Sequence, residues 1–311
     1  MECNSAEQED ALEFDPNYIN TLAGSLDQST AAEDKLTSEL SSGLSVATLE
    51  DNPVAVGQST LLAGSIAQDD TYVQTASGET ASMQVADSAL GEVVTQVTSA
   101  LSLAVEGNNG GLSSSNTATI AQQLTGIRDE VLSLANTSYQ GQYIFGGSQG
   151  STQPFTLNTS TSPATVTYSG DSKLQFVSTP SGQQLQVNLV GSAVFGSGSS
   201  GVLGALNQLI ADYTGTAAST ATLSTDTAAL TTALGQVSDQ RSTLDSSLST
   251  IKSTSTYVQT QASELEITQS AMVSADTATV ATQLSSAETQ HQALLSVVNA
   301  LGSEDLFSLM R

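Results

Sequence analysis

The chain of 311 residues carries 31 acidic and 6 basic side chains, so its formal net charge is −25. This charge repels phosphate backbones and anionic lipid surfaces, and it disfavours nucleic acids and membranes as partners. Aromatic residues make up only 4% of the sequence and tryptophan is absent. Because large rings usually dominate core burial, we expect thin layers of Ala, Leu and Val between paired helices, not a thick globular core.

The segment 1–15 is acidic and lacks any periodic spacing of apolar residues. We interpret it as a disordered extension outside the fold. It contains no apolar core of a signal peptide, and no continuous run of about 18 apolar residues predicts a membrane span anywhere in the chain. The single cysteine, Cys3, excludes an internal disulfide.

The segment 16–50 is predicted to form an N-terminal assembly helix followed by a loop. Its apolar residues recur at spacings of three and four, which favours a coiled-coil helix over a strand. Ser29 and Glu33 occupy two of the inward positions and weaken the seam. Gly43 follows the last periodic residue, where a left-handed cap is expected. The predicted seam residues are Ile19, Leu22, Leu26, Leu36 and Leu40.

The segment 51–140 is predicted to form the first half of a helical rod. Asn52 and Pro53 are typical of an N-cap and a first helical residue, and they predict a long helix from 53 to about 106. Glycines and asparagines at 108–111 break it, and a second helix is expected over about 117–138. The seam of the long helix contains Met83, Asp87, Leu90, Val94, Val97 and Leu101.

The composition of the sequence changes over 141–201, where Gly and Pro become common and the helical spacing of apolar residues stops. Val166 and Tyr168 alternate with polar residues, as do the apolar residues of 185–189, and the segments 169–171 and 180–182 supply turns. This pattern predicts a small β-rich domain inserted mid-chain.

Helical spacing returns after the insert. The segment 202–273 is predicted to form the second half of the rod, and 274–311 a C-terminal assembly helix. The long seam contains Leu230, Leu234, Val237, Arg241, Leu244, Leu248, Ile251, Ser255, Val258, Ala262 and Leu265. The terminal seam contains Leu284, Ala287, His291, Leu294, Val298 and Leu301.

The predicted fold class is therefore mainly α. Long helices that flank an insert pack most simply as antiparallel neighbours, which gives an elongated antiparallel helical rod or coiled coil. The two terminal helices would then pair with each other, and the small β-rich domain would be inserted mid-chain. The terminal seams are thin and would be marginal alone in water. Ordering on self-assembly and an ordinary intramolecular coiled coil are equally compatible with them.

No catalytic, cofactor-binding or metal-ligating residue is predicted, and the chain does not resemble an enzyme. The single histidine, His291, lies on an apolar seam, which is typical of a packing residue. Asp69 and Asp70 are adjacent on a helix and point to different faces, so a solvated surface is expected. Arg128 and Arg241 are isolated bases, interpreted as members of surface ion pairs or, alternatively, as anchors for an acidic partner.

Three short motifs resemble the bacterial flagellin family. The first contains Ser41, Ser42 and Gly43, followed by Asp51 and Pro53. Ser45 stands where the family usually has a basic residue, and Asn52 where it has the second acidic residue. A proline at position 53 resembles the hook-associated branch of the family. The second motif, around Tyr143 and Phe145, resembles the entry to the β domain of that branch. The third is the C-terminal run from Asp276 to Leu309.

The resemblance implies a structural subunit that joins the hook to the filament of the flagellum. Implied partners are further copies of the chain in a ring, hook-associated protein 1, flagellin and a flagellar export chaperone. It also implies export through the flagellar type III apparatus, without a cleaved signal peptide, to an extracellular site. The filament subunit itself is the alternative within the family. Outside it, the alternatives are a coiled-coil binding module without flagellar context and an enzyme with an unrecognised acidic site, which would need carboxylates converging in a pocket.

Overall fold

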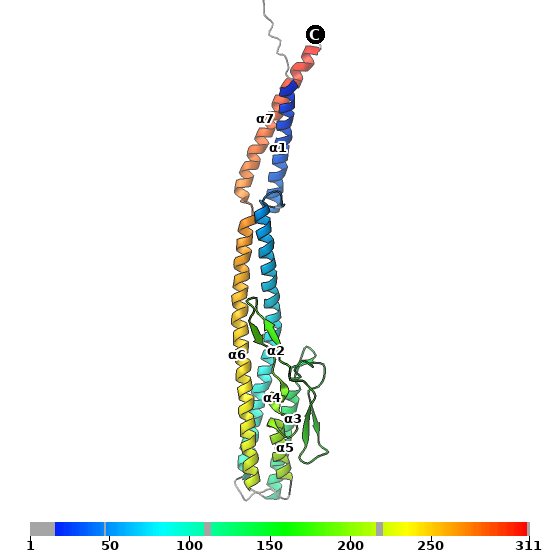
Figure 1. Ribbon diagram of the computed structural model, residues 1–311, viewed down its shortest axis with the longest axis vertical. Helices are drawn as coiled ribbons and strands as arrows, with labels where there is room; N and C mark the ends of the chain where they lie inside the picture. Colours follow the sequence, from blue (N-terminus) through cyan, green and yellow to red (C-terminus); the bar gives the residue numbers. More distant parts are fainter. Residues whose placement is uncertain (1–15, 47, 109–112, 216–219, 310–311) are drawn as a thin grey trace, which may run out of the picture. The chain divides into compact units, whose positions relative to one another are not determined.

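The computed structural model describes residues 16–46, 48–108, 113–215 and 220–309 (Figure 1). The chain divides into two compact units. The terminal unit comprises residues up to 65 and from 264 onward, and the central unit comprises residues 66–263. The predicted extension 1–15 lies outside the described residues.

The fold is mainly α with a small insert of antiparallel strand pairs, and the predicted fold class is confirmed. The helices are α1 Pro16–Ser42, α2 Pro53–Asn108, α3 Ser114–Ala135, α4 Gly191–Phe195, α5 Gly201–Thr214, α6 Thr220–Val273 and α7 Thr277–Leu309. The strands are β1 Ser138–Tyr139, β2 Gln142–Tyr143, β3 Phe155–Asn158, β4 Thr165–Tyr168, β5 Phe176–Ser178 and β6 Gln184–Gln186.

In the terminal unit, α1 and α7 lie side by side and run antiparallel (Figure 1). Gly43 ends α1 with a φ of 70°, in the left-handed region that the sequence predicts for this position. The chain then meets the end of α6 through backbone hydrogen bonds. Ser45 N donates to Val273 O at 2.8 Å, and Ala275 N donates to Gly43 O at 2.8 Å. These bonds fix the two connections, α1 to α2 and α6 to α7, against each other.

Short polar residues cap the next two helices of this unit. The side-chain oxygen Oδ1 of Asn52 accepts a hydrogen bond from Ala55 N at 3.1 Å, as expected of an N-cap residue. Asp276 caps α7 by accepting bonds from Ala278 N at 3.1 Å and from Thr279 Oγ1 at 2.9 Å. The hydrogen bonds from Thr279 and Ala278 lower the pKa of the Asp276 carboxyl.

In the central unit, α2 and α6 lie side by side, and α3 packs against α5 (Figure 1). The spacing of seam residues along α2 and α6 predicts the core well. Its fully buried members include Leu90 and Val97 on α2 and Leu230, Val237 and Ile251 on α6. The segment 202–273, the predicted second half of the rod, contains two helices: α5 ends at Thr214 and α6 begins at Thr220.

The β insert begins earlier than the sequence suggests, because β1 precedes Gly141. Strands β1 and β2 form a hairpin across Gln140 and Gly141, whose φ angles are 50° and 78°. Two successive positive φ values are typical of the tight hairpin turn that matches strand twist. The other pairs are β3 with β4 and β5 with β6, both antiparallel.

Three phenylalanine rings form the core of the insert. Phe145 and Phe155 lie 5.0 Å and 5.4 Å from Phe195 of α4, in edge-to-face arrangements, and all three side chains are fully buried. Asn136 ties α3 to this core. Its Oδ1 accepts from Phe155 N at 2.9 Å and its Nδ2 donates to Phe155 O at 3.0 Å. The insert is thereby anchored to the helices around it.

Within the described chain, α2 is long and apolar enough by length and composition alone to cross a membrane. Its most apolar window has a mean hydropathy of 1.2, and 33% of that window is buried within the protein. The core helix of a soluble protein meets the same criterion, and α2 contributes Leu90, Val93 and Val97 to the core.

Candidate assembly interface

The α1 half of the predicted terminal seam faces α7 with a narrow stripe. Leu22, Leu26 and Leu36 are half-buried, whereas Leu40 is 37% exposed. Ser29 and Glu33, the two polar positions of the seam, are also half-buried. Because helical positions three and four apart share a face, these residues form one continuous line along α1. The side chain of Ile19 lies outside the described residues.

The α7 half follows the same spacing. Leu284, Ala287, His291 and Leu294 are half-buried, and Val298 is 36% exposed. The side chain of Leu301 lies outside the described residues. Sequence reasoning missed Val280, which is 5% exposed and is the most deeply buried residue of α7 over 277–300, where side-chain burial is described. It lies four residues before Leu284, so the same spacing could have found it.

A polar contact crosses the middle of this helix pair. His291 Nδ1 lies 3.9 Å from Glu33 Oε1, and both side chains are 22% exposed. Neither of these two atoms has a hydrogen-bond partner in the described chain. The pair therefore fits the role of a polar layer that favours one register of α1 against α7, because any shift along the helices would separate the two side chains. No group of three or more His, Cys, Asp or Glu side chains that could hold a metal ion occurs in the described part of the chain.

Apolar side chains of the terminal unit remain exposed to solvent. Leu295 and Val297 on α7 are 38% and 40% exposed, and Ile267 near the end of α6 is 70% exposed. On the first turns of α2, Val54 and Leu61 are 68% and 75% exposed. The single chain thus buries its terminal helices incompletely and leaves apolar area that a neighbouring polypeptide could cover.

The residues of the first motif organise the turn between α1 and α2. The hydroxyls of Ser41 and Ser42 donate to Ser38 O at 3.1 Å and 2.7 Å. Asp51 accepts hydrogen bonds from both the backbone and the side chain of Thr48, each at 3.0 Å, and it pairs with Lys35 Nζ at 3.0 Å. The hydrogen bond and charge of Asp51 raise the pKa of the Lys35 ammonium.

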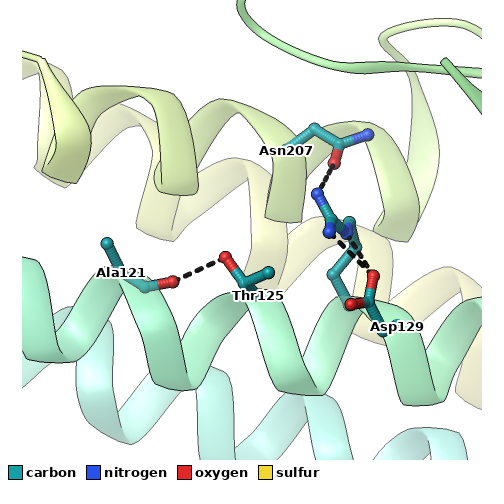
Figure 2. A network of polar contacts seen from close by, with 5 residues as sticks. Ala121, Thr125, Asp129 and Asn207 are labelled. Carbon is teal, nitrogen blue, oxygen red and sulfur yellow. Dashed lines mark hydrogen bonds and ion pairs between the residues drawn. The ribbon is translucent and has the colours of Figure 1, made fainter. Parts of the chain in front are cut away.

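Arg128 is not on the surface, and the expectation of a surface ion pair is wrong for this residue. It is 7% exposed and lies between α3 and α5. Its Nη2 pairs with Asp129 Oδ1 at 2.7 Å, and its Nη1 reaches Asn207 Oδ1 on α5 at 3.4 Å. Figure 2 shows Asp129 and Asn207 on facing helices, where this network ties them together.

Arg241 pairs with Asp87, an acidic residue of the facing seam. Its Nε lies 2.6 Å from Asp87 Oδ1, which joins α6 to α2. A Cβ atom at Gly91 would lie 3.5 Å from the guanidinium, an ordinary van der Waals distance, so the arginine packs directly beside this residue of α2. The hydrogen bond to Asp87 raises the pKa of Arg241. An acidic partner protein is therefore not needed to explain this base.

Asp69 corrects another expectation. Asp70 is exposed as predicted, but Asp69 is 3% exposed and its Oδ2 has no hydrogen-bond partner in the described chain. Burial raises the pKa of the Asp69 carboxyl, with a smaller contribution from the charge of Asp70. A buried and unpaired carboxylate costs stability because its hydration is lost without compensation.

Replacing this carboxyl should stabilise the central unit. We expect Asp69→Leu to raise the free energy of unfolding by about 1–2 kcal/mol, because it exchanges an unsatisfied polar group for an apolar one. Urea denaturation followed by far-ultraviolet circular dichroism measures the change. Asp70→Leu serves as the control and should leave the midpoint nearly unchanged. A lower midpoint for Asp69→Leu would show that the carboxylate has a stabilising partner.

Two further carboxyls meet where α5 joins α6. Burial raises the pKa of Asp226 to about 7, and a hydrogen bond and the charge of Asp212 add to the shift. Gln208 Nε2 donates to Asp212 Oδ1 at 3.3 Å from the preceding turn of α5. A raised folded-state pKa means that the folded chain holds this proton more tightly than the unfolded chain does. The resulting stability is complete below pH 4 and is lost as the pH rises through about 7.

We therefore expect the central unit to gain stability on acidification from pH 8 to pH 5. Because Asp226 is partly exposed, solvent screening limits the expected contribution to about 1 kcal/mol. Chemical denaturation at each pH, compared between the native chain and Asp226→Asn, isolates this contribution from that of the other acids. Asp239→Asn on the exposed face of α6 is the matched control. Identical pH profiles for the native chain and Asp226→Asn would contradict the raised pKa of Asp226.

Two family models match the sequence. The N-terminal helical region of bacterial flagellin matches residues 17–150, and the C-terminal helical region of bacterial flagellin matches residues 227–309. Two curated relatives are each a flagellar hook-associated protein 3. The Salmonella typhimurium protein is 30% identical over 181 residues, which is 58% of this chain and 55% of the relative. The Escherichia coli protein is 34% identical over 118 residues, which is 38% of this chain and 37% of the relative.

Solved structures share the fold. A Vibrio parahaemolyticus protein described as a flagellar hook-associated protein has a TM-score of 0.64 at 17% identity, covering 71% of this chain and 99% of that one. The flagellar junction protein of Legionella pneumophila has a TM-score of 0.56 at 17% identity, covering 71% of this chain and 100% of that one. The two family models together match well over half of the sequence, and the chain belongs to the bacterial flagellin family.

Proposed function

We propose that this chain is a structural subunit of the bacterial flagellum that forms the junction between hook and filament by coiled-coil self-assembly. The observation that carries the proposal is that both curated relatives are hook-associated proteins, matched at 30% and 34% identity. Pro53 and the segment around Tyr143 and Phe145 support the hook-associated branch within the family. The role is mechanical, and no chemical step is assigned to any residue.

The terminal helices are the proposed assembly surface. The seam of α1 and α7 consists of half-buried residues, and exposed apolar side chains lie beside it on the same helices. Packing these faces against neighbouring subunits would remove apolar area from water at roughly 25 cal/mol per Å². The proposed contact residues are Ile19, Leu22, Leu26, Leu36, Leu40, Leu284, Ala287, His291, Leu294, Val298 and Leu301.

The proposed partners follow from this location. Further copies of the chain would form a ring, with hook-associated protein 1 on one side and the first flagellin subunits on the other. A flagellar export chaperone would keep the terminal helices from associating before export through the flagellar type III apparatus. The proposed final location is extracellular, in the flagellum. The proposed organisation along the chain is an assembly helix and loop over 16–50, rod segments over 51–140 and 202–273, an insert over 141–201 and an assembly helix over 274–311.

Immuno-electron microscopy tests the proposed location. An antibody raised against the insert, residues 141–201, should label intact flagella in a narrow band where the filament meets the hook. Labelling along the whole filament would instead make the chain the filament subunit. An absence of labelling, with the epitope shown to be accessible on the purified protein, would overturn a flagellar location.

A further inference from the structure

A cleft of about 480 Å³ opens in the central unit beside the β1–β2 hairpin. One wall is α2, the opposite wall comprises the hairpin and the segment 187–189, and Leu244 of α6 contributes to the lining. This volume lies in the range of small-molecule sites in proteins. The residues proposed for assembly lie elsewhere, in the terminal unit, so the cleft needs a separate explanation.

The α2 wall of the cleft carries a carboxylate without a partner. Glu79 is half-buried, and no described residue provides it with a hydrogen bond or an ion pair. Burial is the only cause that raises the pKa of this carboxyl. By contrast, Asp87, two turns later on the same helix, has Arg241 at 2.6 Å. Glu79 is thus an acid in a concave site that lacks the counter-cation its neighbour has.

The rest of the lining combines polar side chains with the two tyrosines of the hairpin. The polar residues that line the cleft are Ser82, Gln140, Gln142, Ser148, Gln175 and Asn188, and their oxygens can accept hydrogen bonds from a cationic head. Tyr139 and Tyr143 belong to the hairpin wall, and tyrosine rings attract a cation that lies near their faces. Met83, Leu189 and Leu244 are each 2% exposed or less and offer little surface to a ligand. These features complement a small organic cation.

We propose that this cleft binds a small alkylammonium or alkylguanidinium group, with its cationic head at Glu79 and near the tyrosines of the hairpin. A charge-assisted hydrogen bond would satisfy the carboxylate. The net charge of −25 favours this ligand class further, because it raises the local concentration of cations. The same charge opposes anionic ligands.

The cationic group can come from two sources. One is a free diamine in solution, and the other is a basic side chain of a second copy of the chain. Lys173 and Lys252 are exposed and neither ammonium has an ion pair in the described chain, whereas Lys35, Arg128 and Arg241 are each paired within their own chain. Lys173 and Lys252 are therefore the candidate donors from another copy.

Saturation-transfer NMR with the full chain tests the binding chemistry. The probe is 1,4-diaminobutane, and 1,4-butanediol is the neutral control with the same carbon stem. We expect saturable binding of the diamine that weakens as salt is added, and no comparable binding of the diol. Glu79→Gln should weaken diamine binding by about tenfold or more, because the charge-assisted contact is lost. Glu92→Gln, an exposed change of the same charge on the same helix, should have no effect.

Carbodiimide cross-linking of the assembled chain distinguishes the two sources. In assemblies mixed from isotope-labelled and unlabelled chains, a cross-link between Glu79 of one copy and Lys173 or Lys252 of another, absent in Glu79→Gln and suppressed by the diamine, would identify the protein side chain as the ligand. Diamine binding without such a cross-link would identify a free amine. Equal binding of diamine and diol, or unchanged diamine binding by Glu79→Gln, would overturn the proposal. Because Glu79 lies outside the terminal unit, this result leaves the proposed junction role untouched.

Discussion

Leu294→Asp should abolish incorporation of the chain into flagella, whereas Ser249→Asp should be tolerated. Leu294 is half-buried in the α7 half of the terminal seam, and Ser249 is exposed on α6. Placing a carboxylate in a seam costs several kcal/mol unless it finds a partner. Each 1.4 kcal/mol lowers an association constant tenfold, so the loss should exceed about a hundredfold for the first variant. The second variant places the same charge in water and should incorporate to within about twofold.

Complementation of cells that lack the native copy measures this difference. The amount of each variant in sheared flagella is compared with the amount secreted into the medium. Deleting residues 284–311 should have the same consequence as Leu294→Asp and should leave the central unit folded by circular dichroism. Incorporation of both point variants to the same level would contradict the proposed register of α7. Incorporation of the truncated chain would contradict the role of the terminal helices altogether.

Spacing predicts the helical parts of this molecule well because each seam is a local pattern. Leu244 and Ile251, read as inward residues from their intervals of seven, are 2% and 0% exposed. The spacing of apolar residues also accounts for the burial of Asp69, which was expected to be exposed. Ile66, Val73 and Ala76 continue a spacing of threes and fours through Asp69, which places its carboxyl inward. Because the two residues are adjacent on a helix, Asp69 and Asp70 must point to different faces, but adjacency alone does not tell which of them faces the core.

Four other features of the structure are not contained in a local pattern of apolar spacing. The only signal in the sequence for the end of α5 and the start of α6 is the absence of a large apolar residue between Tyr213 and Leu223. The burial of Arg128 depends on Asn207, which lies 79 residues away. Strand β1 has only two residues, too few to show an alternation of apolar and polar residues. Its pairing with β2 depends on the positive φ angles of the turn at Gln140 and Gly141. The register of α1 against α7 is equally invisible to periodicity, since Glu33 and His291 meet only in three dimensions.

Phe195→Ala should unfold the β insert. The Phe195 side chain is fully buried, and its ring lies 5.0 Å from Phe145 and 5.4 Å from Phe155. Removing a buried phenylalanine ring costs about 3–5 kcal/mol, through lost apolar burial and the cavity that remains. Its helix α4 spans only 5 residues and cannot be stable without this anchor. Phe176→Ala, at a ring that is 50% exposed, should cost less than about 1 kcal/mol and is the matched control.

Hydrogen exchange resolved by mass spectrometry separates a local from a global effect. In Phe195→Ala, amides of β3 and β4 should lose protection, while those of α2 and α6 keep it. The three rings join segments centred on 145, 155 and 195, and they belong to the same apolar cluster as the seam of α2 and α6. The seam also contains many buried residues of its own, such as Leu90 and Leu230, which should keep it packed without the Phe195 ring. Equal loss of protection in both regions would mean that the insert and the helices unfold as one cooperative unit. If protection is lost only in the insert and incorporation into flagella persists, the insert is dispensable for assembly, which then depends on the terminal helices.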